Sequence, residues 1–154
     1  MSSQEKHFSK KINFQVAALC FKLSDINKVE VLLVTSRRSK RWVIPKGWPI
    51  KGLKAHKAAE QEALEEAGAV GNILDFCIGK YSYLKELNNK FIPYEVKVYP
   101  LNVIELIEDY KEREQRTRTW VSLKFASENV LEPELKRILR NFNPKMLLNS
   151  NYLK

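Results

Sequence analysis

Three glutamates lie close together in one short stretch of the sequence, at Glu62, Glu65 and Glu66. On an α-helix this i, i+3, i+4 spacing places them within about a 100° sector of one face. Two such charges about 6 Å apart repel by roughly 3 kcal/mol at an effective dielectric constant near 20. A hard divalent cation such as Mg²⁺ or Mn²⁺ would offset that repulsion, because both ions prefer oxygen ligands. The alternative is a solvated acidic helix face, and the spacing alone leaves it open.

A strongly basic stretch comes directly before the acidic one. Residues 36–57 contain no acid, and their cations are Arg37, Arg38, Lys40, Arg41, Lys46, Lys51, Lys54 and Lys57. Guanidinium groups bind phosphate oxygens in a fork, and a metal ion neutralises the charge that develops when a phosphoanhydride is cleaved. We predict that the cations flanking the strand before Gly47 bind a polyphosphate substrate: Arg37, Arg38, Arg41 and Lys46. The alternative is a solvated charge run that keeps the protein soluble.

The acidic stretch and its flanking glycines resemble the signature of the Nudix hydrolases, G-x5-E-x7-R-E-U-x-E-E-x-G-U, where U is an aliphatic residue. In this sequence the match runs from Gly47 to Ala69 without a gap. Two positions depart from it, because Leu53 replaces the first glutamate and Gln61 replaces the arginine. Since one negative and one positive group are absent together, we interpret the departures as a neutral exchange that leaves the enzyme active.

The resemblance implies a role for each matched position. Glu62 and Glu66 would hold Mg²⁺ or Mn²⁺, and the backbone carbonyl of Gly47 would add a metal ligand. Glu65 would be the catalytic base that accepts a proton from water. The strongly charged segment 105–118 offers alternative acids for that role: Glu105, Glu108 and Asp109.

Segments 31–47, 93–99 and 118–122 are similar to the diphosphoinositol polyphosphate phosphohydrolase branch of the family, whose members also tend to hydrolyse diadenosine polyphosphates. The resemblance covers about residues 14–139. It implies a hydrolase that cleaves phosphoanhydride bonds in one of these two small molecules. Trp48 would either stack on a nucleobase as a substrate-binding residue or pack against the protein. A second class stays open, a catalytically weak Nudix module that binds nucleotide or RNA 5′ ends.

Composition narrows the class of protein. A chain of 154 residues that is 44% hydrophobic is long enough for one domain with its own core. Its net charge of +9 permits RNA as a partner, but no RNA-binding motif is present, so a small polyphosphate is favoured. We expect Cys20 and Cys77 to be buried free thiols. The sequence has no apolar stretch of signal-peptide or membrane-span length, so we expect a cytoplasmic location, no membrane partner, and either a monomer or a homodimer.

The elements expected around these residues form a Nudix-type α/β/α sandwich with a mixed β-sheet. We predict strands at 13–21, 29–35, 42–44, 73–85, 94–103 and 119–123. The predicted helices are 54–67 and one or two across 124–130 and 133–141. Gly68 is expected to end the first helix in a left-handed cap, and Pro133 to occupy a first turn. Segment 105–118 is expected as an exposed loop or short helix. The domain would span 13–141, between a polar segment 1–12 and a C-terminal tail 142–154.

Overall fold

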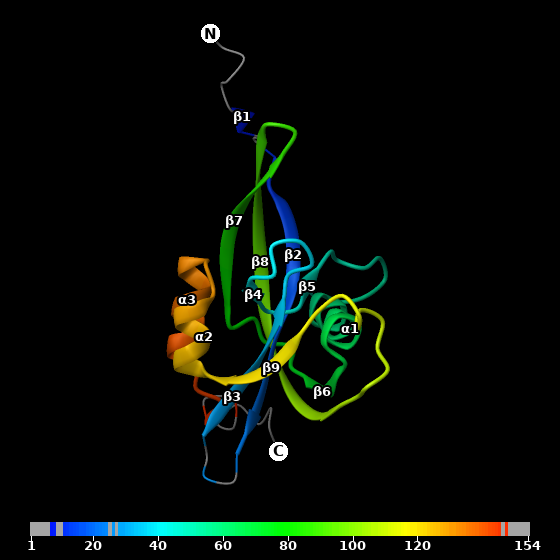
Figure 1. Ribbon diagram of the computed structural model, residues 1–154, viewed down its shortest axis with the longest axis vertical. Coiled ribbons are helices and arrows are strands. Elements are labelled where there is room, and N and C mark those ends of the chain that lie inside the picture. Colours follow the sequence, from blue (N-terminus) through cyan, green and yellow to red (C-terminus); the bar gives the residue numbers. More distant parts are fainter. Residues whose placement is uncertain (1–6, 9–10, 25, 27, 146, 148–154) are drawn as a thin grey trace.

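A computed structural model of the protein describes residues 7–8, 11–24, 26, 28–145 and 147. Within these residues a mixed sheet of nine strands forms the centre of the molecule (Figure 1). Its two longest strands, β2 (Asn13–Leu23) and β8 (Lys90–Leu106), lie side by side and parallel. Outward from β8 and β2 the main path of the sheet follows the order β1-β8-β2-β3-β4.

The remaining strands pair with this central path. They are β1 (His7–Phe8), β3 (Val29–Thr35), β4 (Trp42–Val43), β5 (Lys46–Gly47), β6 (Ala69–Ile73), β7 (Gly79–Leu87) and β9 (Arg118–Ser122). β1 is parallel to β8, whereas β6 and β7 are antiparallel to it. β3 and β5 are antiparallel to β2, and β4 and β9 are antiparallel to β3. The predicted mixed sheet is therefore confirmed.

Helices cover both faces of the sheet, with α1 (Ala55–Ala67) on one face and α2 (Leu123–Asn129) and α3 (Pro133–Asn141) on the other (Figure 1). Successive side chains of a strand point to opposite faces, and β2 follows this rule. Leu19 and Phe21 join a buried cluster with residues of α2 and α3. Ala18 and Cys20 join a second cluster with the alanines of α1. Two cores separated by one sheet make the predicted α/β/α sandwich.

The helix that carries the glutamates ends as the sequence predicts. Ala59, Ala63 and Ala67 are fully buried, and their small side chains let α1 lie close against the sheet. Gly68 follows with a φ of 62°, and its N–H donates to the carbonyls of Ala63 and Leu64. A left-handed conformation at this position favours glycine because it has no Cβ. The helix and its cap fix the direction in which the acidic side chains leave α1.

The predicted strand 73–85 is wrong, because two strands and a loop occupy that region. β8 is 17 residues long, and β6 and β7 pair in succession along the same strand. β6 ends with Ile73 opposite Leu101, and β7 begins with Gly79 opposite Val98. The intervening residues 74–78 are largely apolar, which hides the break in the sequence. Cys77 lies in this loop and is exposed, so only Cys20 meets the expectation of a buried free thiol.

The hairpin between β7 and β8 forms an arm that extends beyond the rest of the sheet (Figure 1). Its turn consists of Asn88 and Asn89, with φ values of 53° and 64°. Two successive positive φ angles are typical of the type I′ turn that suits two-residue hairpins, and asparagine tolerates them. Residues 86–90 therefore form a tight β-hairpin connection. Among the helices that the structure describes, none is both long enough and apolar enough to cross a membrane.

Candidate functional site

The loop that carries Gly47 is bound to the central strand β2. Gly47 pairs with Val16, and the amide of Ala18 donates to the carbonyl of Pro45 at 3.0 Å. This pairing brings Gly47 against α1, where an added Cβ would overlap the carboxylate of Glu62. Glycine is therefore required here to make room for an acidic side chain.

Gly47→Ala should displace that carboxylate without unfolding the protein. The overlap involves the far end of the flexible Glu62 side chain rather than the backbone. We expect the thermal unfolding temperature of the metal-free protein to be nearly unchanged, whereas the affinity for Mn²⁺ should fall by about tenfold or more. Calorimetric titration with Mn²⁺ measures the second effect. An unchanged affinity would show that Gly47 does not govern the position of Glu62.

Glu62 and Glu66 form a carboxyl pair. Their side chains lie close enough for each to affect the pKa of the other. Burial raises the pKa of Glu66 to about 8; the cationic Arg116 opposes the rise and the neighbouring Glu62 adds to it. Burial also raises the pKa of Glu62. The backbone N–H of Lys46 donates to Glu66 at 3.3 Å, which ties the pair to the Gly47 loop. Two acids at one buried site thus share a proton.

A divalent cation fits this pair. Its charge would take the place of the shared proton, and Mg²⁺ is often held by one or two carboxylates together with water and substrate phosphate. The site offers only two side-chain ligands. Among the residues described, no group of three or more His, Cys, Asp and Glu residues is arranged to hold a metal ion. Glu62 and Glu66, the two side chains that the Nudix resemblance implies as metal ligands, are therefore the candidate metal site, and the role of the Gly47 carbonyl stays a prediction.

Glu65 lies beside the pair and has partners of its own. The amide of Gln61 donates to it at 2.7 Å, and the ammonium group of Lys111 lies 3.1 Å away. The hydrogen bond from Gln61 is the main cause that lowers the pKa of Glu65; burial opposes it, and the contact with Lys111 adds to the lowering. Its charge is close enough to raise the pKa of Glu62. Glu65 is thus ionised at neutral pH, as a proton acceptor must be, and its role as the base stays a prediction.

Two residues of the loop 107–117 reach the acidic pair, and the sequence analysis missed both. Arg116 contacts Glu66 at 3.5 Å and Glu112 at 2.9 Å, and it donates to the carbonyl of Thr35 at 3.0 Å. Only 10% of its side chain is exposed. The charge of Glu112 raises the pKa values of both Glu62 and Glu66. Glu112 and Arg116 therefore belong to the site.

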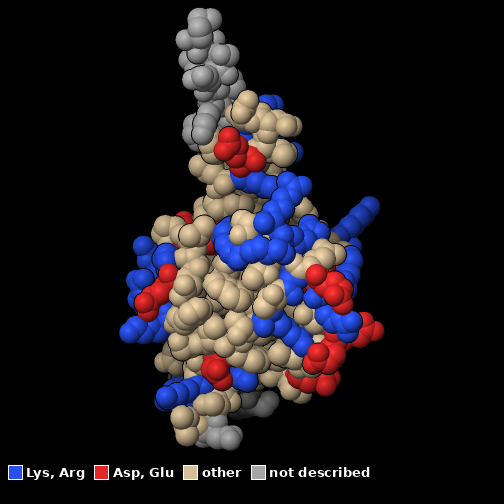
Figure 2. Space-filling model, in the orientation of Figure 1, with Lys and Arg blue, Asp and Glu red and all other residues tan. Residues whose placement is uncertain are grey.

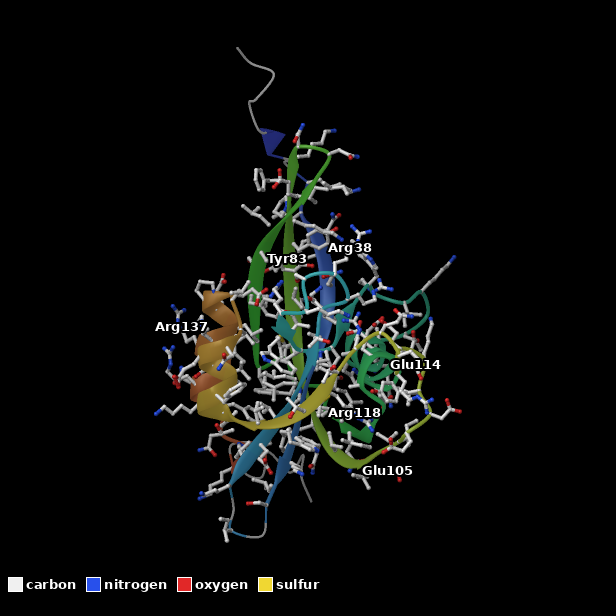
Figure 3. All side chains as sticks on the ribbon, in the orientation of Figure 1. Arg38, Tyr83, Glu105, Glu114, Arg118 and Arg137 are labelled. Atoms are coloured by element: carbon white, nitrogen blue, oxygen red, sulfur yellow. The ribbon has the colours of Figure 1, made fainter. Side chains whose placement is uncertain are left out.

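The acids proposed from segment 105–118 lie elsewhere. Glu105, Glu108 and Asp109 are exposed, and Glu108 pairs with Arg118. In Figure 3 Glu105 lies well away from Arg38 and Tyr83, which line the pocket described next. Because acids and bases are interspersed through the whole segment, nothing in the sequence separates the partly buried Glu112 and Arg116 from their exposed neighbours.

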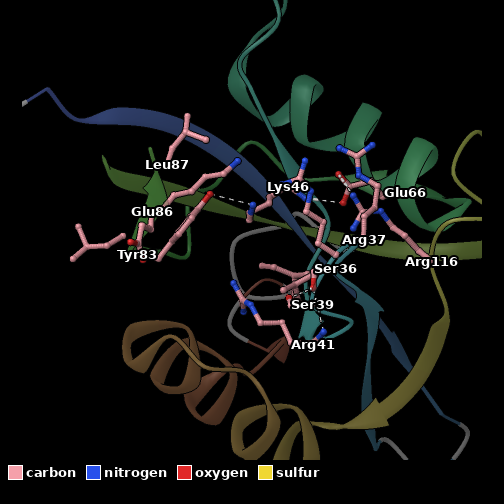
Figure 4. Close-up of a pocket in the computed structure, with 15 residues that line it drawn as sticks. Ser36, Arg37, Ser39, Arg41, Lys46, Glu66, Tyr83, Glu86, Leu87 and Arg116 are labelled. Atoms are coloured by element: carbon pink, nitrogen blue, oxygen red, sulfur yellow. Dashed lines mark hydrogen bonds and ion pairs between the residues drawn. The ribbon is translucent and has the colours of Figure 1, made fainter. Parts of the chain in front are cut away.

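A pocket of about 950 Å³ opens beside Glu66 (Figure 4). All four predicted phosphate-binding cations line it: Arg37, Arg38, Arg41 and Lys46. Lys85 and Arg116 add two further cations. Lysine and arginine side chains gather on this face of the molecule over the loop between β3 and β4 (Figure 2). The structure therefore brings the basic stretch and the acidic helix to one cavity, although they come from different elements.

Within the pocket Lys46 links the two walls. Its ammonium group donates to the hydroxyl of Tyr83 at 3.2 Å, and that hydroxyl donates to Gln15 at 2.7 Å. Burial lowers the pKa of Lys46, against the raising effect of nearby Glu66. Trp48, in contrast, does not line the pocket; it is half-exposed and contacts Tyr94 with ring centroids 5.5 Å apart. Its predicted contact with substrate stays a prediction that the geometry does not favour.

Comparison with known proteins shows which sequences and folds this chain resembles. No family model matches the sequence. The chain is 34% identical over 113 residues to the mitochondrial Nudix hydrolase 17 of Arabidopsis thaliana, a match that covers 70% of this chain and 60% of that protein. It is 33% identical over 115 residues to diphosphoinositol polyphosphate phosphohydrolase 3-alpha of Homo sapiens, covering 73% of this chain and 65% of that protein. The chain belongs to the Nudix superfamily.

The fold of this Nudix protein is also found in solved structures. A binary complex of the C. elegans Ap4A hydrolase superimposes with a TM-score of 0.64 at 22% identity, covering 90% of this chain and 98% of that one. At such identity the likeness establishes the fold alone. The chain spans less than two thirds of the length of the curated relatives given above.

The two departures from the Nudix signature have different surroundings. Leu53 is 47% exposed, whereas Gln61 donates to Glu65. The amide of Gln61 therefore donates a hydrogen bond without a charge to Glu65, four residues further along α1, and Lys111 supplies a cation from another segment. The interpretation of a neutral exchange stays a hypothesis.

The shared proton predicts how the stability of the metal-free Nudix protein depends on pH. An unfolded glutamate titrates near 4.5, whereas folded Glu66 titrates at about 8. Between these values the folded state holds a proton that the unfolded state has lost, so stability falls as pH rises, by up to about 1.4 kcal/mol per pH unit. We expect the unfolding temperature in EDTA to fall between about pH 5 and about pH 8, and Glu66→Gln to remove most of this slope. A flat profile in the unsubstituted protein would contradict the shared proton.

Proposed function

We propose that this protein is a metal-dependent hydrolase that cleaves a phosphoanhydride bond in a diphosphoinositol polyphosphate. The observation that carries the proposal is the composition of the pocket beside Glu66. Six cations line it against two acids, Glu66 and Glu86. A compact ligand with a dense negative charge is what such a cavity would bind, because arginine and lysine side chains neutralise phosphate oxygens.

The pocket offers charge rather than a free aromatic surface, which favours an inositol substrate over a diadenosine polyphosphate. Tyr83 is the one aromatic residue among its described lining residues. The ring of Tyr83 is already stacked on Tyr94, with centroids 5.0 Å apart, and the ammonium group of Lys46 lies 4.9 Å from its centre. A nucleobase needs an open ring face for stacking. Trp48 has an exposed surface but lies outside this lining.

The roles of the residues follow from their positions. Glu62 and Glu66 would hold a divalent ion, Mg²⁺ or Mn²⁺, which when bound supplies Lewis-acid neutralisation of the phosphate oxygens. Arg116 fixes the position of Glu66 through a contact of 3.5 Å. Glu65, ionised by its hydrogen bond from Gln61, would accept a proton from the attacking water. The pocket cations would hold the phosphates that flank the cleaved bond: Arg37, Arg38, Arg41 and Lys46.

A substrate panel with Mg²⁺ tests the proposal. We expect release of orthophosphate from diphosphoinositol polyphosphates, with slower cleavage of diadenosine polyphosphates, nucleoside triphosphates, ADP-ribose and capped RNA. Trp48→Ala should leave the Michaelis constant for the inositol substrate unchanged. A preference for diadenosine polyphosphates that is lost in Trp48→Ala would overturn the substrate assignment and place the nucleobase at Trp48.

The departures at Leu53 and Gln61 favour a second candidate, a catalytically weak Nudix module that binds nucleotide or RNA 5′ ends. Binding without turnover across the same panel would support it. A small-molecule ligand, a monomer or homodimer, and a cytoplasmic location are parts of the main proposal. Several relatives are named as mitochondrial or chloroplastic proteins, so imaging of the tagged protein in its own cells is the test of location.

A further inference from the structure

A partly buried ion pair connects the pocket to the start of α3. The guanidinium of Arg41 contacts the carboxylate of Glu132 at 3.1 Å. Arg41 lines the pocket at the end nearest the helices α2 and α3, away from Glu66 (Figure 4). Glu132, which directly precedes α3, is only 5% exposed. A residue from the C-terminal helices thus touches one of the phosphate-binding cations.

Glu132 does not use its carboxylate to stabilise its own helix. It stands at the N-cap of α3, where a side-chain oxygen commonly accepts a hydrogen bond from a backbone N–H of the first turn. Here the side chain makes no capping hydrogen bond, and Pro133 begins the helix. The carboxylate is directed to Arg41 instead.

The pair is not arranged for maximum stability. One nitrogen of Arg41, Nη1, and one oxygen of Glu132, Oε1, are buried without a hydrogen-bond partner among the described atoms. Buried polar atoms without partners are unfavourable, and a buried ion pair is often no more stable than an apolar pair of similar size. This pair has one short contact and two atoms without partners, so a role in positioning the Arg41 side chain explains it better than a role in stabilising the fold.

The charge of Glu132 also reaches a second cation of the pocket. Burial lowers the pKa of Lys46, while the charges of Glu66 and then Glu132 act in the opposite direction. Glu132 contacts Arg41 and Glu66 contacts Arg116, so two of the pocket cations each have a carboxylate as a partner.

We propose that Glu132 is a positioning residue, which holds the guanidinium of Arg41 at the wall of the pocket. The guanidinium is then oriented for a phosphate group before the ligand binds. The inference rests on the proposed function to the extent that the pocket binds a polyphosphate. Preorganisation of this kind raises affinity because the side chain loses less conformational freedom on binding.

A double-mutant cycle measures the coupling. Tripolyphosphate is titrated in a metal-free buffer into the unsubstituted protein, Glu132→Gln, Arg41→Met and the double variant. We expect Glu132→Gln to weaken binding by about tenfold, and to have no further effect when Arg41 is already replaced. Glu134→Gln is the matched control, because Glu134 lies in the first turn of α3 but its carboxylate accepts from the amide of Ser82 instead of contacting Arg41, and this variant should bind like the unsubstituted protein.

A second variant guards against a trivial loss of folding. Glu132→Asp keeps the acid, and aspartate is a good N-cap residue, so α3 should form normally. Its shorter side chain withdraws the carboxylate from Arg41, so we expect binding to weaken by a few-fold to tenfold with unchanged thermal unfolding. If Glu132 served only to stabilise the fold, Glu132→Asp would fold normally and would bind tripolyphosphate as tightly as the unsubstituted protein.

The outcomes separate this inference from the proposed function. Equal loss of affinity in both Arg41 backgrounds, no loss in Glu132→Gln, or no binding of tripolyphosphate by the unsubstituted protein would each overturn it. Coupling of the two residues in a protein that cleaves no member of the substrate panel would leave the inference standing and remove the proposed hydrolase activity. If the protein hydrolyses a member of the panel and Glu132→Gln does not change that turnover, the proposed hydrolase activity stands and the positioning role of Glu132 is overturned.

Discussion

Glu66→Gln should lower the turnover of the preferred polyphosphate by about a thousandfold while the fold is retained. Glutamine has nearly the same shape as glutamate, and its oxygen can still accept the hydrogen bond from the amide of Lys46. It carries no negative charge, so one of the two proposed ligands of the divalent ion is lost. The measurement is initial rate with saturating Mg²⁺, together with the affinity for Mn²⁺ from calorimetry.

Stability provides the second readout for this variant. In the metal-free protein Glu66 is a buried acid beside Glu62, and burial raises its pKa to about 8. Replacing it with a neutral amide should therefore leave the unfolding temperature at about pH 8 unchanged or higher. Loss of activity together with loss of stability would point to misfolding instead.

A control on the same helix tests whether any carboxylate of α1 would give the same result. Glu60 lies two residues before Glu62 on the same helix and forms a surface pair with Lys57 at 3.4 Å. Exposed pairs of this kind contribute little. We expect Glu60→Gln to retain full activity and metal affinity. Equal losses in the two variants would mean that the net charge of the helix, rather than the pair at Glu62 and Glu66, governs the reaction.

Most of the fold follows from local patterns in the sequence. The apolar runs at 13–21 and 29–35 became the central strands β2 and β3, and the alanines spaced by four fixed the buried side of α1. Gly68 ends α1 and Pro133 begins α3 because of their own backbone preferences, which can be predicted from the residue type alone. The break between β6 and β7 could not be predicted, because it depends on the length of β8 and on pairing between residues far apart in the chain.

In the candidate site, too, the residues that are close in sequence could be predicted, whereas those from distant segments could not. The carboxylates of α1 and the cations of the preceding loop are close in sequence, so their spacing alone predicts that they form one site. Glu112, Arg116 and Glu132 reach the site from later segments, and each sits among similar charged residues. What distinguishes them is burial, which arises only when the loop 107–117 and the helix α3 are packed against the sheet.

Arg116 is the residue for which that burial has the largest expected consequence. It contacts both Glu66 and Glu112, and only 10% of its side chain is exposed. Arg116→Met keeps a side chain of similar length but leaves these two acids and Glu62 without the guanidinium. Removing one partner of a buried charge network costs about 3–5 kcal/mol. We expect a loss of that size in the free energy of unfolding at about pH 8, measured by urea denaturation in EDTA.

The dependence on conditions distinguishes an electrostatic role of Arg116 from simple packing. The pKa of Glu66 is already raised to about 8 with the arginine present, so below that pH this acid takes up a proton and needs a cation less. The loss in Arg116→Met should therefore shrink toward about pH 6, and Mg²⁺ should restore part of it at about pH 8, because the ion replaces the missing positive charge. Arg113→Met is the matched control, since Arg113 belongs to the same loop but pairs with Glu114 at the surface, and its stability should not change measurably. A loss in Arg116→Met that is the same at both pH values and indifferent to Mg²⁺ would assign Arg116 to packing, and the acidic pair would then have to be neutralised by its shared proton alone.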